Sequence, residues 1–331
     1  MVELPIKFGI TLPGLDVREN LEVARHADRI GVDSLWVIET RLSTDAITPL
    51  AAYASVTDRI RVGSGVIPIW TRNPALIAQT FATLDSLAPG RVIMGLGAWW
   101  EPLARRTGVT REKPVRAMRE VIESVRLLLS LEGPVTYKGE YVDLENVYLD
   151  HGRFEPHKVK VYIGAVGPQM LRLAGRIADG VVLNNYQTAD AVRQQVEEVR
   201  KGAESAGRSL DEIDRVKLLR VEITRNKKKT IQDNKPRFAM YLAQQPHIQG
   251  PSRVDPELFQ RVKALIPWPA TEEQCLEAAK LIPDDLIDDL TCFGDEEEVR
   301  ARIQEYLAAG ATKPIISGAT KETIDFLAKG F

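Results

Sequence analysis

Residues 7–38 read KFGITLPGLDVRENLEVARHADRIGVDSLWVI, and this stretch decides the fold class. The apolar run over residues 7–12 predicts a buried strand, and residues 17–30 carry apolar side chains at helical spacing. Gly31 is expected to end that helix, and residues 34–38 form a second apolar run. A strand, a helix and a second strand in this order predict two parallel strands joined by a right-handed crossover.

The same alternation continues along the chain. Further strands are expected at residues 60–67, 91–96, 159–163, 180–183, 216–223 and 313–316. Further helices are expected at residues 45–56, 74–87, 114–131, 169–177 and 189–206, and from Thr320. Eight strands with intervening helices predict a (β/α)8 TIM barrel, and the length of 331 residues fits one such domain over residues 1–331.

Two segments interrupt this alternation. Residues 135–142 predict a hairpin with Lys138-Gly139 at its turn. Residues 226–285 are polar, helical in pattern and interrupted by prolines. We interpret them as a helical insertion before the last strand of the barrel, and not as a second domain.

Composition excludes several classes of partner. A net charge of −2 provides no positive field to hold nucleic acid. No apolar run approaches the roughly 20 residues that cross a membrane. Residues 1–7 lack the apolar core of a signal peptide, and two cysteines do not make a disulfide framework, so we expect a cytoplasmic protein.

Several familiar chemistries are also missing from the sequence. No G-x-G-x-x-G follows the first predicted strand, which disfavours a doubly wound dinucleotide-binding fold. No G-x-S-x-G or Ser/His/Asp set is evident, and the four histidines and two cysteines fall on no metal-ligand spacing. We therefore expect no metal site, and a redox cofactor would have to carry the difficult chemical step.

Chemistry in a TIM barrel belongs at the carboxyl ends of the strands. Those ends carry aromatic side chains and two carboxylates: Glu39, Trp70, Trp99, Trp100 and Glu101. Such a rim suits a flat heteroaromatic ligand, although tryptophans also pack under long loops. Residues 164–168 run directly into a helix, where small residues let backbone N–H groups approach an anion or simply allow close packing.

Two long motifs resemble a known family. The first runs from Trp70-Thr71-Arg72-Asn73-Pro74-Ala75 through residues 82–85 to residues 90–97, and the second covers residues 162–180. Both strongly resemble the luciferase-like (bacterial luciferase superfamily) flavin and deazaflavin oxidoreductases. Within that superfamily the chain looks most like the methylenetetrahydromethanopterin reductases, which pass hydride from reduced coenzyme F420 to a carbon acceptor.

The resemblance implies a cofactor and its contacts. Coenzyme F420, or FMN as the alternative, would lie in the barrel mouth with its ring against Gly65 and Val66, which the family joins by a non-proline cis peptide. Ala98 and Trp99 match positions that approach the chain of the deazaflavin. The positions that match its phosphate-binding backbone N–H groups are Val166, Gly167, Gln169 and Met170. The resemblance further implies a homodimer acting on a small molecule such as a tetrahydropterin.

Some positions differ from the pattern of the reductases. Thr11 stands where they carry a glutamate, and Thr40 stands where deazaflavin enzymes often have a histidine. Trp100 replaces a usual acidic residue. Our candidates for donating or accepting a proton are therefore the carboxylates Glu39 and Glu101. Two alternatives stay open: an FMN-dependent monooxygenase, and a luciferase-like protein that binds a ligand or partner without catalysis.

Overall fold

The computed structural model describes residues 7–12, 16–150 and 156–330. The first six residues, on which the expectation of no signal segment largely rests, lie outside these ranges. Eight parallel strands form the centre of the molecule: β1 (Gly9–Thr11), β2 (Ser34–Val37), β3 (Arg61–Ser64), β5 (Val92–Gly97), β8 (Lys160–Ala165), β9 (Gly180–Leu183), β10 (Asp214–Leu219) and β13 (Lys313–Ile316).

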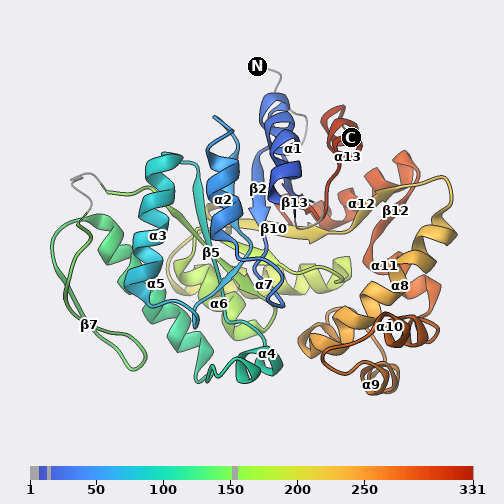
Figure 1. The fold of residues 1–331 in the computed structure, drawn as a ribbon. Helices are drawn as coiled ribbons and strands as arrows, with labels where there is room; N and C mark the ends of the chain where they lie inside the picture. Colours follow the sequence, from blue (N-terminus) through green and yellow to red (C-terminus); the bar gives the residue numbers. More distant parts are fainter. Residues whose placement is uncertain (1–6, 13–15, 151–155, 331) are drawn as a thin grey trace.

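These strands close into a barrel, which confirms the predicted fold class. Their order is β3-β2-β1-β13-β10-β9-β8-β5, and pairing of β3 with β5 closes the circle. Every neighbouring pair is parallel, as in the match of Ile10 with Leu35 and with Ile316. Figure 1 shows the barrel surrounded by the helices that connect its strands.

The connecting helices follow the predicted alternation. They are α1 (Val17–Ile30), α2 (Ile47–Ala54), α3 (Pro74–Leu87), α5 (Pro114–Ser130), α6 (Pro168–Ile177), α7 (Ala189–Ser205), α12 (Glu296–Ala308) and α13 (Lys321–Ala328). The first of them begins where the Asp16 side chain accepts the N–H groups of Arg18 and Glu19. It ends at Gly31, as predicted, because that residue has a φ of 91° and its N–H closes the last turn.

Side chains fill both faces of the barrel wall. The interior holds large residues that stack across the axis: Trp36, Ile93, Tyr162, Val182, Val216, Leu218 and Ile315. Trp36 and Tyr162 pack with their ring centroids 5.5 Å apart. A larger apolar cluster lies between the strands and the surrounding helices. The strands are therefore apolar on both faces, which explains why they appear in the sequence as continuous apolar runs.

The hairpin prediction was wrong about the turn. The two strands are β6 (Val135–Lys138) and β7 (Asp143–Val147), so the turn covers residues 139–142 and not Lys138-Gly139. The carboxylate of Glu120 on α5 accepts the N–H groups of Glu140, Tyr141 and Val142. A buried side chain on the preceding helix thus organises the turn, and the sequence of the turn itself does not show this.

The segment before the last strand is helical, as predicted. It contains α8 (Lys227–Gln244), a short η2 turn (Pro246–Ile248), α9 (Pro256–Leu265), α10 (Glu272–Ala279) and α11 (Asp284–Leu290). These helices share an apolar cluster distinct from the barrel core. The strand expected at residues 216–223 is two strands, because after β10 the chain turns away and β11 (Val221–Ile223) pairs with β12 (Cys292–Gly294). That the whole chain is one domain stays a prediction.

Three smaller elements complete the described chain. A two-residue strand, β4 (Ile67–Pro68), follows β3, and a short helix, α4 (Glu101–Arg106), follows β5. A 3-10 turn, η1 (Leu210–Glu212), precedes β10. Over residues 7–12, 16–150 and 156–330, none of the helices is long and apolar enough to cross a membrane.

Candidate functional site

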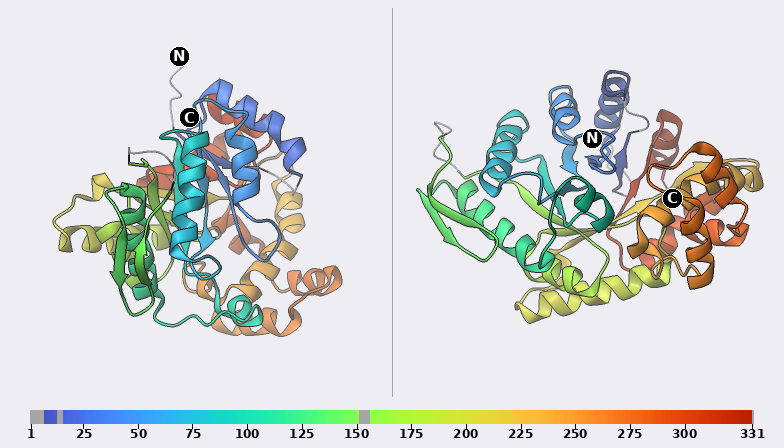
Figure 2. Two further views of the ribbon diagram at one scale, coloured as in Figure 1. Left: turned by 60° about the vertical axis from the view of Figure 1, so that its left-hand side comes forward. Right: turned by 60° about the horizontal axis from the view of Figure 1, so that its bottom comes forward.

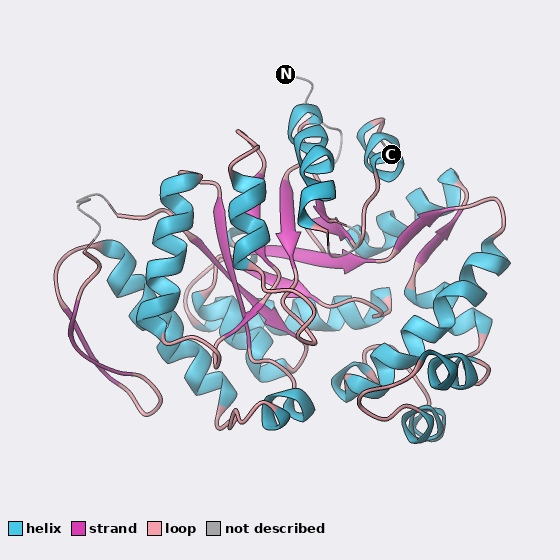
Figure 3. Ribbon diagram, in the orientation of Figure 1, coloured by secondary structure: helices cyan, strands magenta, loops and turns pink. Residues whose placement is uncertain are grey.

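The carboxyl ends of the barrel strands open toward α4 and the helices α8–α10. Figure 1 shows these helices together at the bottom of the molecule, and the right panel of Figure 2 brings that end forward. In Figure 3 the arrow of the strand beside α1 points toward the same end. We call the rim formed by residues 38–42, 65–66, 98–101, 166–170 and 184–187 the barrel mouth.

The third strand carries a bulge at the mouth. The Gly65–Val66 peptide is cis, which confirms the prediction. The bulge separates β3 from β4 and projects over the neighbouring strands β5 and β8. The N–H of Gly65 still continues the pairing with β2, donating to the Val37 carbonyl at 2.8 Å.

Glycines on β5 and β8 make room for this bulge. A Cβ atom on Gly95 would lie 1.9 Å from the backbone oxygen of Ser64, and one on Gly97 would lie 2.3 Å from a methyl group of Val66. A Cβ on Gly164 would lie 3.1 Å from the same side chain. The three glycines therefore form a cradle in which the bulge sits, and we call this set (Gly95, Gly97 and Gly164) the glycine cradle.

In the segment after β5, hydrogen bonds hold the first residue, and the next two residues carry indole N–H groups without a partner among the described residues. The carbonyl of Ala98 accepts hydrogen bonds from Trp70 Nε1 at 2.8 Å and Arg111 Nε at 2.6 Å. Trp99 has a φ of 57°, an uncommon backbone conformation for a bulky residue. The indole nitrogens of Trp99 and Trp100 are buried without a hydrogen-bond partner among the described residues. Such donors suit a polar ligand atom.

The loop after β8 leads into a helix that lacks a side-chain cap. Gly167 is the N-cap residue of α6, and no side chain accepts the first N–H groups of the helix. Pro168 has no N–H, so Gln169 and Met170 carry the first free donors, while Leu171 donates to the Gly167 carbonyl at 3.1 Å. A Cβ on Gly167 would meet nothing within 4 Å. This open helix start fits an anionic group.

Glu39 lies at the mouth but is held by protein groups. Its carboxylate forms a bidentate ion pair with Arg72, at 2.8 and 3.1 Å, and accepts the N–H of Ala46 at 2.9 Å. The three contacts join the loop after β2 to the loop after β4 and to the start of α2. A transfer of a proton from Glu39 to a ligand would have to break one of them.

Glu101 is more accessible. It begins α4, its side chain is 57% exposed, and one oxygen lies 3.1 Å from Arg111. Arg111 also lies near His247 of the η2 turn, and desolvation together with this guanidinium lowers the pKa of His247 to about 4. An uncharged imidazole from the insertion thus lies close to the group that contacts Glu101.

The insertion also closes against α4. The rings of Trp100 and Trp268 pack edge to face with centroids 5.4 Å apart. Arg106 donates to the Trp268 carbonyl at 3.3 Å. Trp100 is therefore a packing residue between α4 and the loop after α9, as the alternative interpretation of the tryptophans proposed, while Trp99 remains at the mouth.

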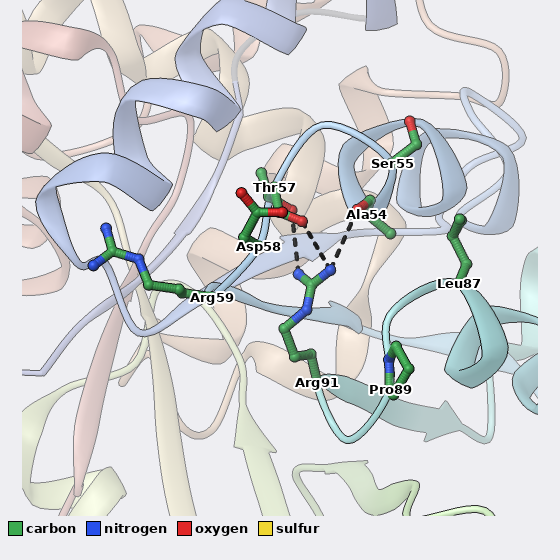
Figure 4. A pocket seen from close by; sticks show the side chains of 8 residues that line it. All are labelled: Ala54, Ser55, Thr57, Asp58, Arg59, Leu87, Pro89 and Arg91. Carbon is green, nitrogen blue, oxygen red and sulfur yellow. Dashed lines mark hydrogen bonds between the residues drawn. The ribbon is translucent and has the colours of Figure 1, made fainter.

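Another hollow lies at the opposite end of the barrel and does not belong to this site. It is lined by residues between α2 and β3 and by Leu87, Pro89 and Arg91 before β5. Figure 4 shows the guanidinium of Arg91 bound to backbone oxygens of Ala54 and Thr57. Because that cation is already satisfied by the chain, the hollow has a structural explanation.

Sequence reasoning missed several residues of the mouth. Arg72 and Arg111 contact the candidate carboxylates, and His247 lies near Arg111. Arg41 and Arg237 lie close to each other. Arg72 stands within the quoted third-strand motif, but nothing local identifies its partner Glu39, 33 residues earlier. Among the residues the structure describes, which leave out His151, no cluster of acidic, histidine or cysteine side chains could hold a metal ion.

Comparison with known proteins identifies the class. The chain belongs to the luciferase-like family, because residues 4–313 match the family profile described as luciferase-like monooxygenase. Its relatives are oxidoreductases, so this chain is an enzyme of the same kind. It is 28% identical to the 5,10-methylenetetrahydromethanopterin reductase of Archaeoglobus fulgidus over 95% of this chain and 93% of that protein. It is also 28% identical to the F420-dependent glucose-6-phosphate dehydrogenase of Amycolatopsis mediterranei, over 94% and 91%.

A solved structure agrees with this assignment. The coenzyme F420-dependent tetrahydromethanopterin reductase of Methanopyrus kandleri superposes with a TM-score of 0.85 at 26% identity, covering 98% of this chain and 97% of that one. The barrel and its insertion are thus shared over nearly the whole length.

Proposed function

We propose that this enzyme transfers hydride between coenzyme F420 and a carbon acceptor, and that it is most like the methylenetetrahydromethanopterin reductases. The observation that carries the proposal is that the bulge and the uncapped start of α6 lie on either side of β5, because β3, β4 and β8 all pair with that strand. The glycine cradle on β5 and β8 makes room for the bulge, and α6 follows β8 directly. The F420-dependent relatives over more than nine-tenths of the chain support the same cofactor.

Different residues of the mouth would contact different parts of the cofactor. Coenzyme F420, when bound, supplies a two-electron hydride carrier. Gly65 and Val66 would support its ring, and Ala98 and Trp99 would flank its chain. The anion would be bound by the backbone of residues that start α6: Val166, Gly167, Gln169 and Met170. The indole ring of Trp99 would exclude water from the space above the bulge.

We propose that Glu101 is the acid that supplies a proton during the reaction. Its side chain is accessible at the mouth, and Arg111 holds it at 3.1 Å. Glu39 remains the second candidate, although its contacts with Arg72 and Ala46 favour a positioning role for the loop after β2. We further propose a homodimer, as the family resemblance implies, a cytoplasmic location, and a tetrahydropterin as acceptor in one-carbon metabolism.

A binding experiment tests the cofactor. The purified protein is mixed separately with F420 and with FMN, passed through gel filtration, and the visible absorbance of the protein fraction is recorded. We expect F420 to be retained at one molecule per chain and FMN to be lost. Retention of FMN alone would favour a flavin monooxygenase, and retention of neither would favour a binding protein without catalysis.

A further inference from the structure

Three arginines converge on the half of the mouth that faces the insertion. Arg41 follows β2, Arg220 ends β10, and Arg237 lies on α8. Arg41 Nη2 lies 2.9 Å from Met240 Sδ, and Arg220 Nη2 lies 3.4 Å from Asn234 Oδ1. Positions 234, 237 and 240 share one face of the helix, so Arg237 lies between the other two guanidiniums.

Among the described residues, these cations, Arg41, Arg220 and Arg237, form no ion pair with a carboxylate. Glu222 is the acidic group near Arg220. Burial and the neighbouring Arg237 lower the pKa of both Arg41 and Arg220. Bringing like charges together in a partly buried place is unfavourable unless an anion joins them.

Buried polar groups lie at the same place. Nε of Arg220 is buried and has no hydrogen-bond partner among the described residues. The buried hydroxyl of Tyr186 lies close to the guanidiniums of Arg220 and Arg237. Tyr186 is only 3% exposed, and its ring packs 5.1 Å from the ring of Tyr241 on the same helix face as Arg237. The Arg237 side chain, in contrast, is accessible from solvent. The cluster is thus open on one side and supplies donors on the other.

We infer that Arg41, Arg220 and Arg237 form a subsite for an anionic group, a carboxylate or a phosphate, of the hydride acceptor. Guanidinium groups bind both anions through paired N–H donors. The subsite follows strands β2, β9 and β10, whereas the proposed cofactor contacts follow β3, β5 and β8, so the two ligands would enter the mouth from opposite halves. This inference rests on the proposed function, because it assigns the remaining half of the mouth to the acceptor.

Calorimetric titration tests the subsite with simple probes. Inorganic phosphate and malonate are titrated separately into the F420-loaded protein, into Arg237→Gln and Arg41→Gln, and into Arg261→Gln, which removes an exposed arginine of α9. We expect at least one probe to bind about tenfold more weakly to the first two variants than to the parent, because a charge-assisted contact is lost. Arg261→Gln should bind as the parent does. If only phosphate binding depends on these arginines, the acceptor carries a phosphate group. If only malonate binding does, the acceptor carries a carboxylate.

Two results would overturn the inference. One is equal affinity for both probes in all four proteins, including no binding in any of them. The other is a loss of F420 affinity in Arg237→Gln and Arg41→Gln as large as the loss of affinity for the probes, which would show that the arginines bind the cofactor. If the probes depend on Arg237 in a protein that binds no F420, the anion subsite stands and the proposed function fails.

Discussion

At the scale of single residues, the two candidate carboxylates differ in their surroundings and should differ in effect. Glu101→Gln removes an accessible acid that has one ion-pair contact, so we expect kcat to fall by about 10²-fold or more with little change in thermal stability. Glu112→Gln, an exposed neighbour, is the matched control. Steady-state rates and thermal melting measure the two properties, and a kcat within about threefold of the parent would remove Glu101 as the acid.

Glu39→Gln should act mainly on stability. The amide cannot keep the paired charge-assisted bonds to Arg72, so we expect the free energy of unfolding to fall by about 1–2 kcal/mol. Urea unfolding measures it, with kcat recorded on the same preparation. A large loss of kcat with unchanged stability would instead assign the proton to Glu39.

A larger side chain at Gly167 should weaken cofactor binding without destabilising the fold. It has an ordinary extended backbone, and a Cβ there meets no protein atom within 4 Å. Gly167→Val should therefore leave the unfolding midpoint unchanged but place side-chain atoms beside the first N–H groups of α6. We expect the Kd for F420 to rise about tenfold, since a charge-assisted hydrogen bond is worth roughly that much. Gly250→Val, at another open glycine, is the control, and equal F420 affinity in both variants would argue against the anion-binding role.

At the scale of elements, the glycine cradle determines where the bulge of the third strand can sit. A methyl group on Gly97 would lie 2.3 Å from Val66, so Gly97→Ala should destabilise the fold by about 1–3 kcal/mol. Removing the opposing methyl groups should relieve the contact, and we expect Gly97→Ala with Val66→Ala to recover part of that loss. Gly95→Ala should show no such rescue, because its contact is with the backbone oxygen of Ser64. Denaturant unfolding of Gly97→Ala, Gly95→Ala, Val66→Ala and the two glycine–Val66 double variants measures this coupling, and strictly additive effects of Gly97→Ala and Val66→Ala would contradict the packing.

The strands and helices of the barrel were predictable because each depends on a local pattern. Residues 7–38 already contain two apolar runs, a helical repeat and a terminating glycine, and the structure places all of them as expected. The cis bond at Gly65–Val66 was predictable only through the family resemblance. The turn at residues 139–142 was not, because Glu120 on a separate helix organises it. The same holds for Arg72, because its partner Glu39 lies 33 residues earlier and meets it only in the folded chain.

At the scale of the whole molecule, one buried lysine should shape the dependence of stability on pH. Lys217 lies on the outer face of β10, 1% exposed, with its ammonium over the ring of Tyr306 and donating to the carbonyl of Leu218 at 3.1 Å. Burial lowers its pKa from 10.5 to about 7. Between these two values the unfolded chain binds more protons than the folded one, so the contribution of Lys217 to stability rises with pH.

We expect this contribution to increase by about 1.5 kcal/mol between pH 7 and pH 8.5. Below the folded pKa both states are protonated and the dependence disappears. The measurement is urea unfolding of the parent and of Lys217→Met at several pH values, because their difference isolates this group from the cysteines and tyrosines. The same slope in both proteins would show that Lys217 does not lose its proton in the folded state.

The central claim for the whole molecule is hydride transfer through coenzyme F420. The most direct measurement is a single turnover in which the protein, loaded with reduced F420, is mixed anaerobically with methylene-tetrahydromethanopterin in a stopped-flow instrument. We expect the visible absorbance of oxidised F420 to appear in one exponential phase, and this phase to slow about 10²-fold or more in Glu101→Gln. Reduced F420 that stays unoxidised in this mixture, together with oxygenation of a substrate by the same protein supplied with reduced FMN and oxygen, would contradict this claim.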